Sequence, residues 1–99
     1  MAIDEICKAL GSETRLRILE ILANGGMSSV KVYHEYSKKF HDKKQRESIF
    51  RALQKLVDVN ILEKVYDDKK KEIIYKLKAK EITIDLVNQR LKVVNNGTQ

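Results

Sequence analysis

The chain has no proline and no tryptophan, and it has only one cysteine and four glycines among its 99 residues. A single cysteine, Cys7, excludes a disulfide bond within the chain and any zinc cluster built from cysteines. No apolar run approaches the roughly 20 residues that a helix needs to span a bilayer. The absence of proline is typical of a compact, mostly helical chain with short connections.

Sequence motifs of catalysis are also missing. The chain contains no glycine-rich phosphate loop, no G-x-S-x-G and no H-E-x-x-H, and Cys7 has no histidine beside it. We therefore expect a protein that is not an enzyme and uses no cofactor. The first ten residues carry two acids and no long apolar centre, which is unlike a secretory signal. This indicates a cytoplasmic, intracellular protein.

Positive charge is concentrated in one part of the chain. The formal net charge is +6, from 20 Lys and Arg against 14 Asp and Glu. Between Lys38 and Lys55, seven cations face two acids, so this stretch alone carries +5. A localised cationic surplus attracts polyanions such as nucleic acids. The composition, 42% hydrophobic and 34% charged, is that of one folded domain over residues 1–99.

The segment from Asp42 to Val59 has the spacing of an amphipathic helix. Asp42 and Gln45, three residues apart, predict a capping pair at its start. Helical spacing places an apolar stripe on one side and a largely cationic stripe on the other. The apolar stripe comprises Ile49, Phe50, Leu53, Leu56 and Val57, and the opposite stripe comprises Lys44, Ser48, Arg51 and Lys55. Such a helix suits a DNA major groove, and the alternative is an ordinary solvated charged face.

Individual roles follow from side-chain chemistry. Gln45 and Arg51 are suited to bidentate contacts with adenine and guanine, whereas lysines more often hold phosphates. Arg46 is ambiguous, because its helical angle falls towards the buried side. The predicted DNA-binding residues are Lys43, Lys44, Gln45, Arg46, Ser48, Arg51, Lys55, Lys69, Lys70 and Lys71. The last three lie in a predicted hairpin turn and suit the minor groove, although a solvated hairpin tip explains any one of them equally well.

Other elements are expected on both sides of this segment. Helices are predicted over residues 2–10, 13–24 and 29–40, with Ser12 capping the second and Ser28 or Ser29 the third. A very short strand is expected at Met27 and Ser28. Residues 61–66 and 72–77 alternate and are rich in β-branched residues, which predicts a β-hairpin with a basic turn. From about Lys80 the helical spacing returns, and it predicts a final helix over residues 79–95.

Both terminal helices are predicted to carry a narrow apolar seam. The residues expected at a dimer interface are Ile3, Ile6, Cys7, Leu10, Ile84, Val87, Leu91 and Val94. The last four step by three, four and three, which is typical of a helix that pairs with another helix. The alternative is that the two helices cover each other within one chain. If Cys7 lies on a dimer axis, it is a candidate for an intersubunit disulfide bond.

The predicted order of helices followed by a basic hairpin is that of a winged helix-turn-helix, mainly α with a small β-hairpin. Two segments, K-A-L-G-S-E-T-R-L-R-I-L-E-I-L and S-I-F-R-A-L-Q-K-L-V-D-V-N-I-L, resemble the ArsR-type transcriptional regulators. Together with the exit I-I-Y-K-L, the resemblance covers residues 8–78, and small winged-helix proteins of archaea and their viruses look similar. Asn60 stands where the family usually has glycine, and asparagine is the next-best residue for a left-handed backbone.

The resemblance implies a transcriptional regulator that binds DNA as a homodimer, with two recognition helices in successive major grooves. It places the helix-turn-helix at residues 29–59, the wing at 61–78 and the dimerisation helices at 1–11 and 79–95. Metal sensors of this family use paired cysteines or Asp and His ligands, and this chain matches neither pattern, since only His34 and His41 are present. We therefore expect no metal sensing. The alternative from another class is a winged-helix adaptor that binds other proteins.

Overall fold

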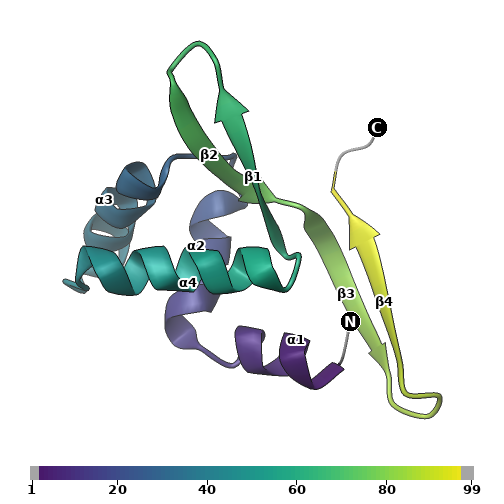
Figure 1. Cartoon of the computed structure of the whole chain (residues 1–99). Coiled ribbons are helices and arrows are strands. Elements are labelled where there is room, and N and C mark those ends of the chain that lie inside the picture. Colours follow the sequence, from purple (N-terminus) through teal and green to yellow (C-terminus); the bar gives the residue numbers. More distant parts are fainter. Residues whose placement is uncertain (1–2, 97–99) are drawn as a thin grey trace.

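Four helices and two antiparallel hairpins form an α+β arrangement in the computed structural model, which describes residues 3–96 (Figure 1). The helices are α1 (Ile3–Leu10), α2 (Glu13–Leu22), α3 (Ser29–Phe40) and α4 (Arg46–Asp58). The strands are β1 (Leu62–Asp67), β2 (Glu72–Leu77), β3 (Ala79–Asp85) and β4 (Arg90–Asn95). Within residues 3–96, no helix is both long enough and apolar enough to cross a membrane.

The predicted N-caps of α2 and α3 are confirmed. The Ser12 hydroxyl accepts a hydrogen bond from the Arg15 backbone N–H at 3.3 Å, and the Ser28 hydroxyl accepts one from the Lys31 N–H at 3.2 Å. Each serine pairs one of the N–H groups that a helix start leaves without a partner. The hydroxyls thus determine where α2 and α3 begin.

The predicted start of α4 is wrong. The helix begins at Arg46, four residues later than Asp42, and Gln45 precedes it without a side-chain capping hydrogen bond. Asp42 is unavailable as a cap because its carboxylate accepts a hydrogen bond from Arg17 of α2 at 3.3 Å. A tertiary ion pair therefore replaces the local cap that the sequence spacing predicts.

The end of α4 follows the prediction for Asn60. Its φ is +63°, so the backbone is left-handed there. The Ile61 N–H donates to the Leu56 carbonyl and the Asn60 N–H donates to the Val57 carbonyl, both at 3.0 Å. This pair of bonds is the Schellman motif, which ends a helix and satisfies its last carbonyls. It directs the chain immediately into β1.

The core lies where α1, α2, α3 and α4 meet the base of the β1–β2 hairpin. Its fully buried side chains come from all of these elements and include Ile6, Ile18, Val32, Tyr36, Ile49, Leu53, Leu56 and Leu62. The predicted stripe of α4 is largely confirmed, except that Phe50 is 37% exposed and Ala52 is buried in addition. Leu16 of α2 lies outside the core and is 50% exposed. The core thus holds α4 by one side.

The β1–β2 hairpin matches its prediction and has a third, minimal partner. Strand register pairs Leu62 with Leu77 and Asp67 with Glu72. Met27 forms a single bridge to Tyr75, through N–H to carbonyl bonds of 3.0 and 2.9 Å. This bridge is the short strand expected at Met27. The neighbouring Gly26 has no room for a side chain, because a Cβ there would lie 2.8 Å from Cγ2 of Ile74.

The predicted helix over residues 79–95 is wrong, because this segment is the β3–β4 hairpin. Strand register pairs Ile82 with Val93 and Ile84 with Leu91, so these four side chains share one face and all are half-buried. Val94 pairs with Glu81, and Val87 lies in the turn with 91% of its surface exposed. The hairpin projects from the helices, with its turn at the far end (Figure 1).

At the other terminus, the α1 seam is also only partly as predicted. Ile6 is fully buried in the core of its own chain, which leaves it no surface for a second copy. Ile3 and Leu10 are half-buried, and Cys7 is exposed with a free thiol. The surface of α1 that remains available is therefore smaller than the spacing suggested.

Asp85 holds the β3–β4 turn, and this contact should depend on pH. The Asn88 side chain and the N–H groups of Asn88 and Val87 donate to the Asp85 carboxylate, and they lower its pKa below the ordinary value of 3.8. Because the folded pKa is lowered, the contribution of this carboxylate is present at higher pH and disappears as the pH falls through the folded pKa. An NMR titration of the Asp85 carboxyl carbon should give a midpoint below 3.8, and Asn88→Ala should raise it. A midpoint at or above 3.8 in the unsubstituted chain would contradict this.

Candidate nucleic-acid interface

Helix α4 has one side fixed in the core and one side open to solvent. Ile49, Leu53 and Leu56 have no exposed surface, whereas the Arg51 side chain is 77% exposed. Lys55 is also exposed. The buried side limits rotation of the helix about its axis, and this fixes the direction in which the cationic side points. The two stripes expected from the sequence therefore exist as two sides of one helix, except that Lys44 of the polar stripe lies in the connection before α4.

Each of two cations on this side has a carboxylate near it. Arg51 lies 3.8 Å from Glu47 one turn earlier, and Lys44 lies 3.8 Å from Asp42. Exposed pairs at such distances contribute little to stability. Both cations can therefore exchange these partners for a phosphate or a base at small cost.

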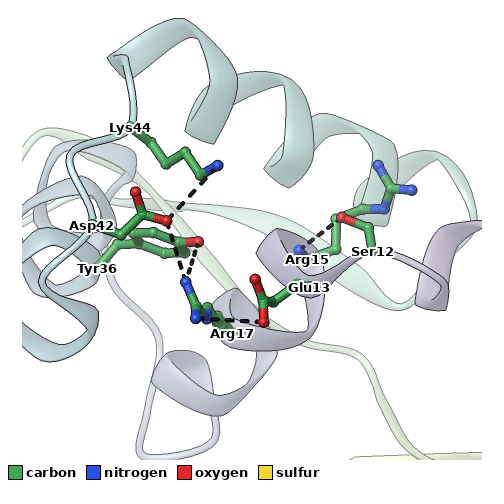
Figure 2. Close-up of polar contacts among 7 residues, drawn as sticks. All are labelled: Ser12, Glu13, Arg15, Arg17, Tyr36, Asp42 and Lys44. Carbon is green, nitrogen blue, oxygen red and sulfur yellow. Dashed lines mark hydrogen bonds and ion pairs between the residues drawn. The ribbon is translucent and has the colours of Figure 1, made fainter.

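Arg17 of α2 organises the connection between α3 and α4, as Figure 2 shows. Its guanidinium donates to the Tyr36 hydroxyl and to Asp42, both at 3.3 Å, and lies 3.5 Å from Glu13. It also lies 4.8 Å from the centre of the Phe40 ring. The hydrogen bond with Tyr36 raises the pKa of Arg17 further above its ordinary value, so the group stays cationic. Through Asp42, this cluster positions the residues that precede α4.

A groove runs between the start of α2 and the open side of α4. Its volume is about 640 Å³. Ser48, Arg51 and Lys55 line it from α4 and Lys44 from the connection before α4, whereas Ser12, Thr14 and Arg15 line it from the N-cap and first turn of α2. The groove therefore brings together four of the predicted DNA-binding residues, and hydroxyl groups from α2 form its second wall.

The α2 wall was not predicted, because no sequence signal links it to α4. Arg15 is held in place, since its Nε donates to the Ala9 carbonyl at 2.6 Å and its Nη2 donates to the Lys8 carbonyl at 3.0 Å. The positive charge of Arg15 also interacts favourably with the negative, C-terminal end of the α1 helix dipole. Thr14 lies beside it, half-buried, on the groove. Only the tertiary packing of α2 against α1 and α4 identifies these residues.

The remaining predicted DNA-binding residues lie in three places. Lys43 and Gln45 are exposed in the connection before α4. Arg46 is exposed and its guanidinium lies 5.4 Å from the centre of the Tyr33 ring, so it packs against α3. Lys69, Lys70 and Lys71 are exposed in the β1–β2 turn, away from α4 (Figure 1). The backbone N–H groups of Lys69 and Lys70 donate to Asp67, which shapes that turn.

The two histidines lie on α3 and at its C-terminal end. His34 is exposed and its ring lies 5.4 Å from the Tyr33 ring, and His41 is exposed in a left-handed conformation at the end of α3. Over residues 3–96, no three His, Cys, Asp or Glu side chains are grouped closely enough to hold a metal ion.

In comparisons with known proteins, no family model, curated protein or solved structure matches the chain.

Proposed function

We propose that the chain binds double-stranded DNA with sequence preference, as a homodimer, and regulates transcription by occupying a promoter without sensing a metal. In this proposal α3 and α4 form a helix-turn-helix, and the β1–β2 hairpin is its wing. The fold is then a winged helix-turn-helix, in which the second helix enters the major groove. The resemblance of residues 8–78 to ArsR-type regulators favours the same reading.

One observation carries the proposal: the open side of α4 presents Arg51, Lys55 and Ser48, with Lys44 just before the helix, and the opposite side is held in the core by the fully buried Ile49, Leu53 and Leu56. A rigid helix with a planar guanidinium on its outer side can hold that group against base edges. The lysines at the two ends of the stripe suit the phosphates on either side of a groove. The groove beside α2 adds hydroxyl donors along the same surface.

A protein–protein adaptor is the second candidate, and it is favoured by a different surface. Tyr66 and Ile73 pair across the β1–β2 hairpin and are 56% and 49% exposed. Tyrosine is enriched among the residues that dominate the binding energy of protein interfaces. An adaptor of this kind would have no need of the cations on α4.

Salt dependence of duplex binding distinguishes the two functions. A protein that contacts several phosphates loses affinity steeply as salt rises. A plot of the logarithm of the binding constant against the logarithm of the salt concentration has a slope of about −0.9 for each phosphate contact. Replacing Lys69, Lys70 and Lys71 together by alanine should reduce the slope by about 2 to 3. Replacing Lys78, Lys80 and Lys92 instead removes the same charge from the other hairpin region. That variant should keep the slope of the unsubstituted protein.

Two results would contradict the proposal. If both triple variants lower the slope equally, the attraction is general and the wing has no specific role. If the unsubstituted chain shows no preference for any sequence selected from a random duplex pool, the adaptor function is favoured instead.

A further inference from the structure

The turn of the β3–β4 hairpin presents two apolar side chains to solvent. Leu86 is 74% exposed and Val87 is 91% exposed, the highest values among the large apolar residues of the described chain. The Val87 backbone N–H donates to the Asp85 carboxylate at 3.1 Å, and the Gln89 side-chain amide donates to the Leu86 carbonyl at 2.6 Å. A tip that is ordered in advance loses little conformational entropy when it binds. We call Leu86 and Val87 the hairpin tip.

The same chain carries an apolar groove at the base of this hairpin. The groove has a volume of about 300 Å³ and lies between α1, α2 and the start of β3. Its apolar lining is Leu10, Leu19, Ile61, Leu77, Ala79 and Ile82. A cavity of about 150 Å³ with such a lining accommodates benzene. The groove is therefore large enough for aliphatic side chains the size of Leu and Val.

A chain cannot place its own tip in its own groove. Ala79 and Ile82 belong both to the groove and to β3, and the tip lies beyond the other end of that strand. Ile82 is the groove residue nearest the tip in sequence, and four residue steps of about 3.4 Å separate it from Leu86, which is roughly 14 Å along the strand. Figure 1 shows the turn at the far end of the projecting hairpin. A hairpin tip that occupies this groove therefore comes from another molecule, and a second copy brings both a tip and a groove.

Charge also favours a second copy at this end of the molecule. In α1, one lysine faces two acids, which gives −1, and over residues 79–95 three cations face two acids, which gives +1. The two elements together are neutral, whereas residues 38–55 carry +5. Two copies can therefore approach through α1 and the hairpin without the mutual repulsion that the α4 side would cause.

We propose that two chains exchange hairpin tips, so that Leu86 and Val87 of each lie in the groove of the other. The contact is the same in both directions, as a two-fold dimer requires. It also covers the apolar face of a two-stranded hairpin, which is marginally stable when left uncovered. This gives a specific interface to the homodimer of the proposed function. It can fail on its own, because a monomer would still bind a half-site through α4.

The oligomeric state tests the tip. Sedimentation velocity over a range of concentrations should show a dimer for the unsubstituted chain. Leu86→Asp with Val87→Asp should weaken dimerisation by at least about a hundredfold, because two apolar side chains per chain are lost from the interface. The matched control is Tyr66→Asp with Ile73→Asp, which alters an exposed apolar pair on the other hairpin and should leave the dimer intact. A monomeric unsubstituted chain, or equal loss in both variants, would overturn the proposal.

Cross-linking tests whether the hairpin tip of one chain lies in the groove of another. In a Cys7→Ser background, one chain carries Val87→Cys at the tip and another carries Lys80→Cys at the edge of the groove. Oxidation of the mixture should give a disulfide-linked heterodimer, and each variant alone should remain largely uncross-linked. If Val87→Cys alone forms the linked dimer, the tips meet each other and the proposed exchange is wrong. Salt-dependent binding of a half-site duplex, measured on the same samples, reports on the DNA function separately.

Discussion

Replacing Arg51 by alanine should lower affinity for a selected duplex by about 5- to 150-fold and relax the preference at one base pair, since a bidentate guanidinium contact with guanine is worth about 1–3 kcal/mol. The Arg51 side chain is 77% exposed and its nearest acid, Glu47, lies 3.8 Å away. The residue is therefore available to a base edge without disruption of the fold. Competition binding with the selected duplex and with single-base variants measures both effects.

Two matched variants separate the role of Arg51 from its charge. Arg51→Lys keeps the charge but loses the planar guanidinium. It should therefore lose the preference at the recognised base pair, as Arg51→Ala does, and keep the salt dependence of binding of the unsubstituted protein. Glu47→Ala removes the competing carboxylate and should strengthen binding to every duplex. If Arg51→Ala weakens selected and random duplexes equally, Arg51 contacts phosphate and reads no base.

Local chemistry explains the parts of the fold that the sequence predicts well. Ser12 begins α2 and Asn60 ends α4 because each acts through its own backbone or its nearest neighbours. The buried stripe of α4 depends only on spacing along one helix. The polar stripe on its other side, including Arg51, follows from the same spacing. Such features need no knowledge of distant residues.

The C-terminal hairpin was predicted as a helix because the apolar residues of this segment fit both a helical and an alternating spacing. Ile84, Val87, Leu91 and Val94 satisfy a helical spacing, but E-I-T-I-D alternates strictly and is rich in β-branched residues. Asp85 then provides the turn through bonds to Val87 and Asn88. The alternation and the turn chemistry together outweigh four spaced apolar positions. This change of element also changes which apolar residues share a face.

Long-range contacts account for the rest of what the sequence did not show. Asp42 has the spacing of a cap, yet Arg17, 25 residues away, takes its carboxylate. Thr14 joins the candidate interface only because α2 packs beside α4. Neither contact has a local signature, since each depends on how three helices meet. The candidate site was therefore predictable on α4 and unpredictable on α2.

The largest effect on stability is expected from Leu53→Ala, which removes the anchor behind the candidate interface. Leu53 has no exposed surface and lies in the core cluster that α4 shares with α2 and α3. Truncating a buried leucine lowers the free energy of unfolding by about 2–5 kcal/mol, out of roughly 5–15 kcal/mol for a domain. Urea denaturation followed by circular dichroism measures the loss.

Leu16→Ala is the matched control, because it removes the same atoms from a leucine that is 50% exposed. It should lower the free energy of unfolding by less than about 1 kcal/mol, since about half of that residue's surface already contacts water. Equal losses in the two variants would mean that α4 is not held by its buried side. The cationic side would then have no fixed direction, and the geometric basis for DNA recognition by Arg51 would be lost with it.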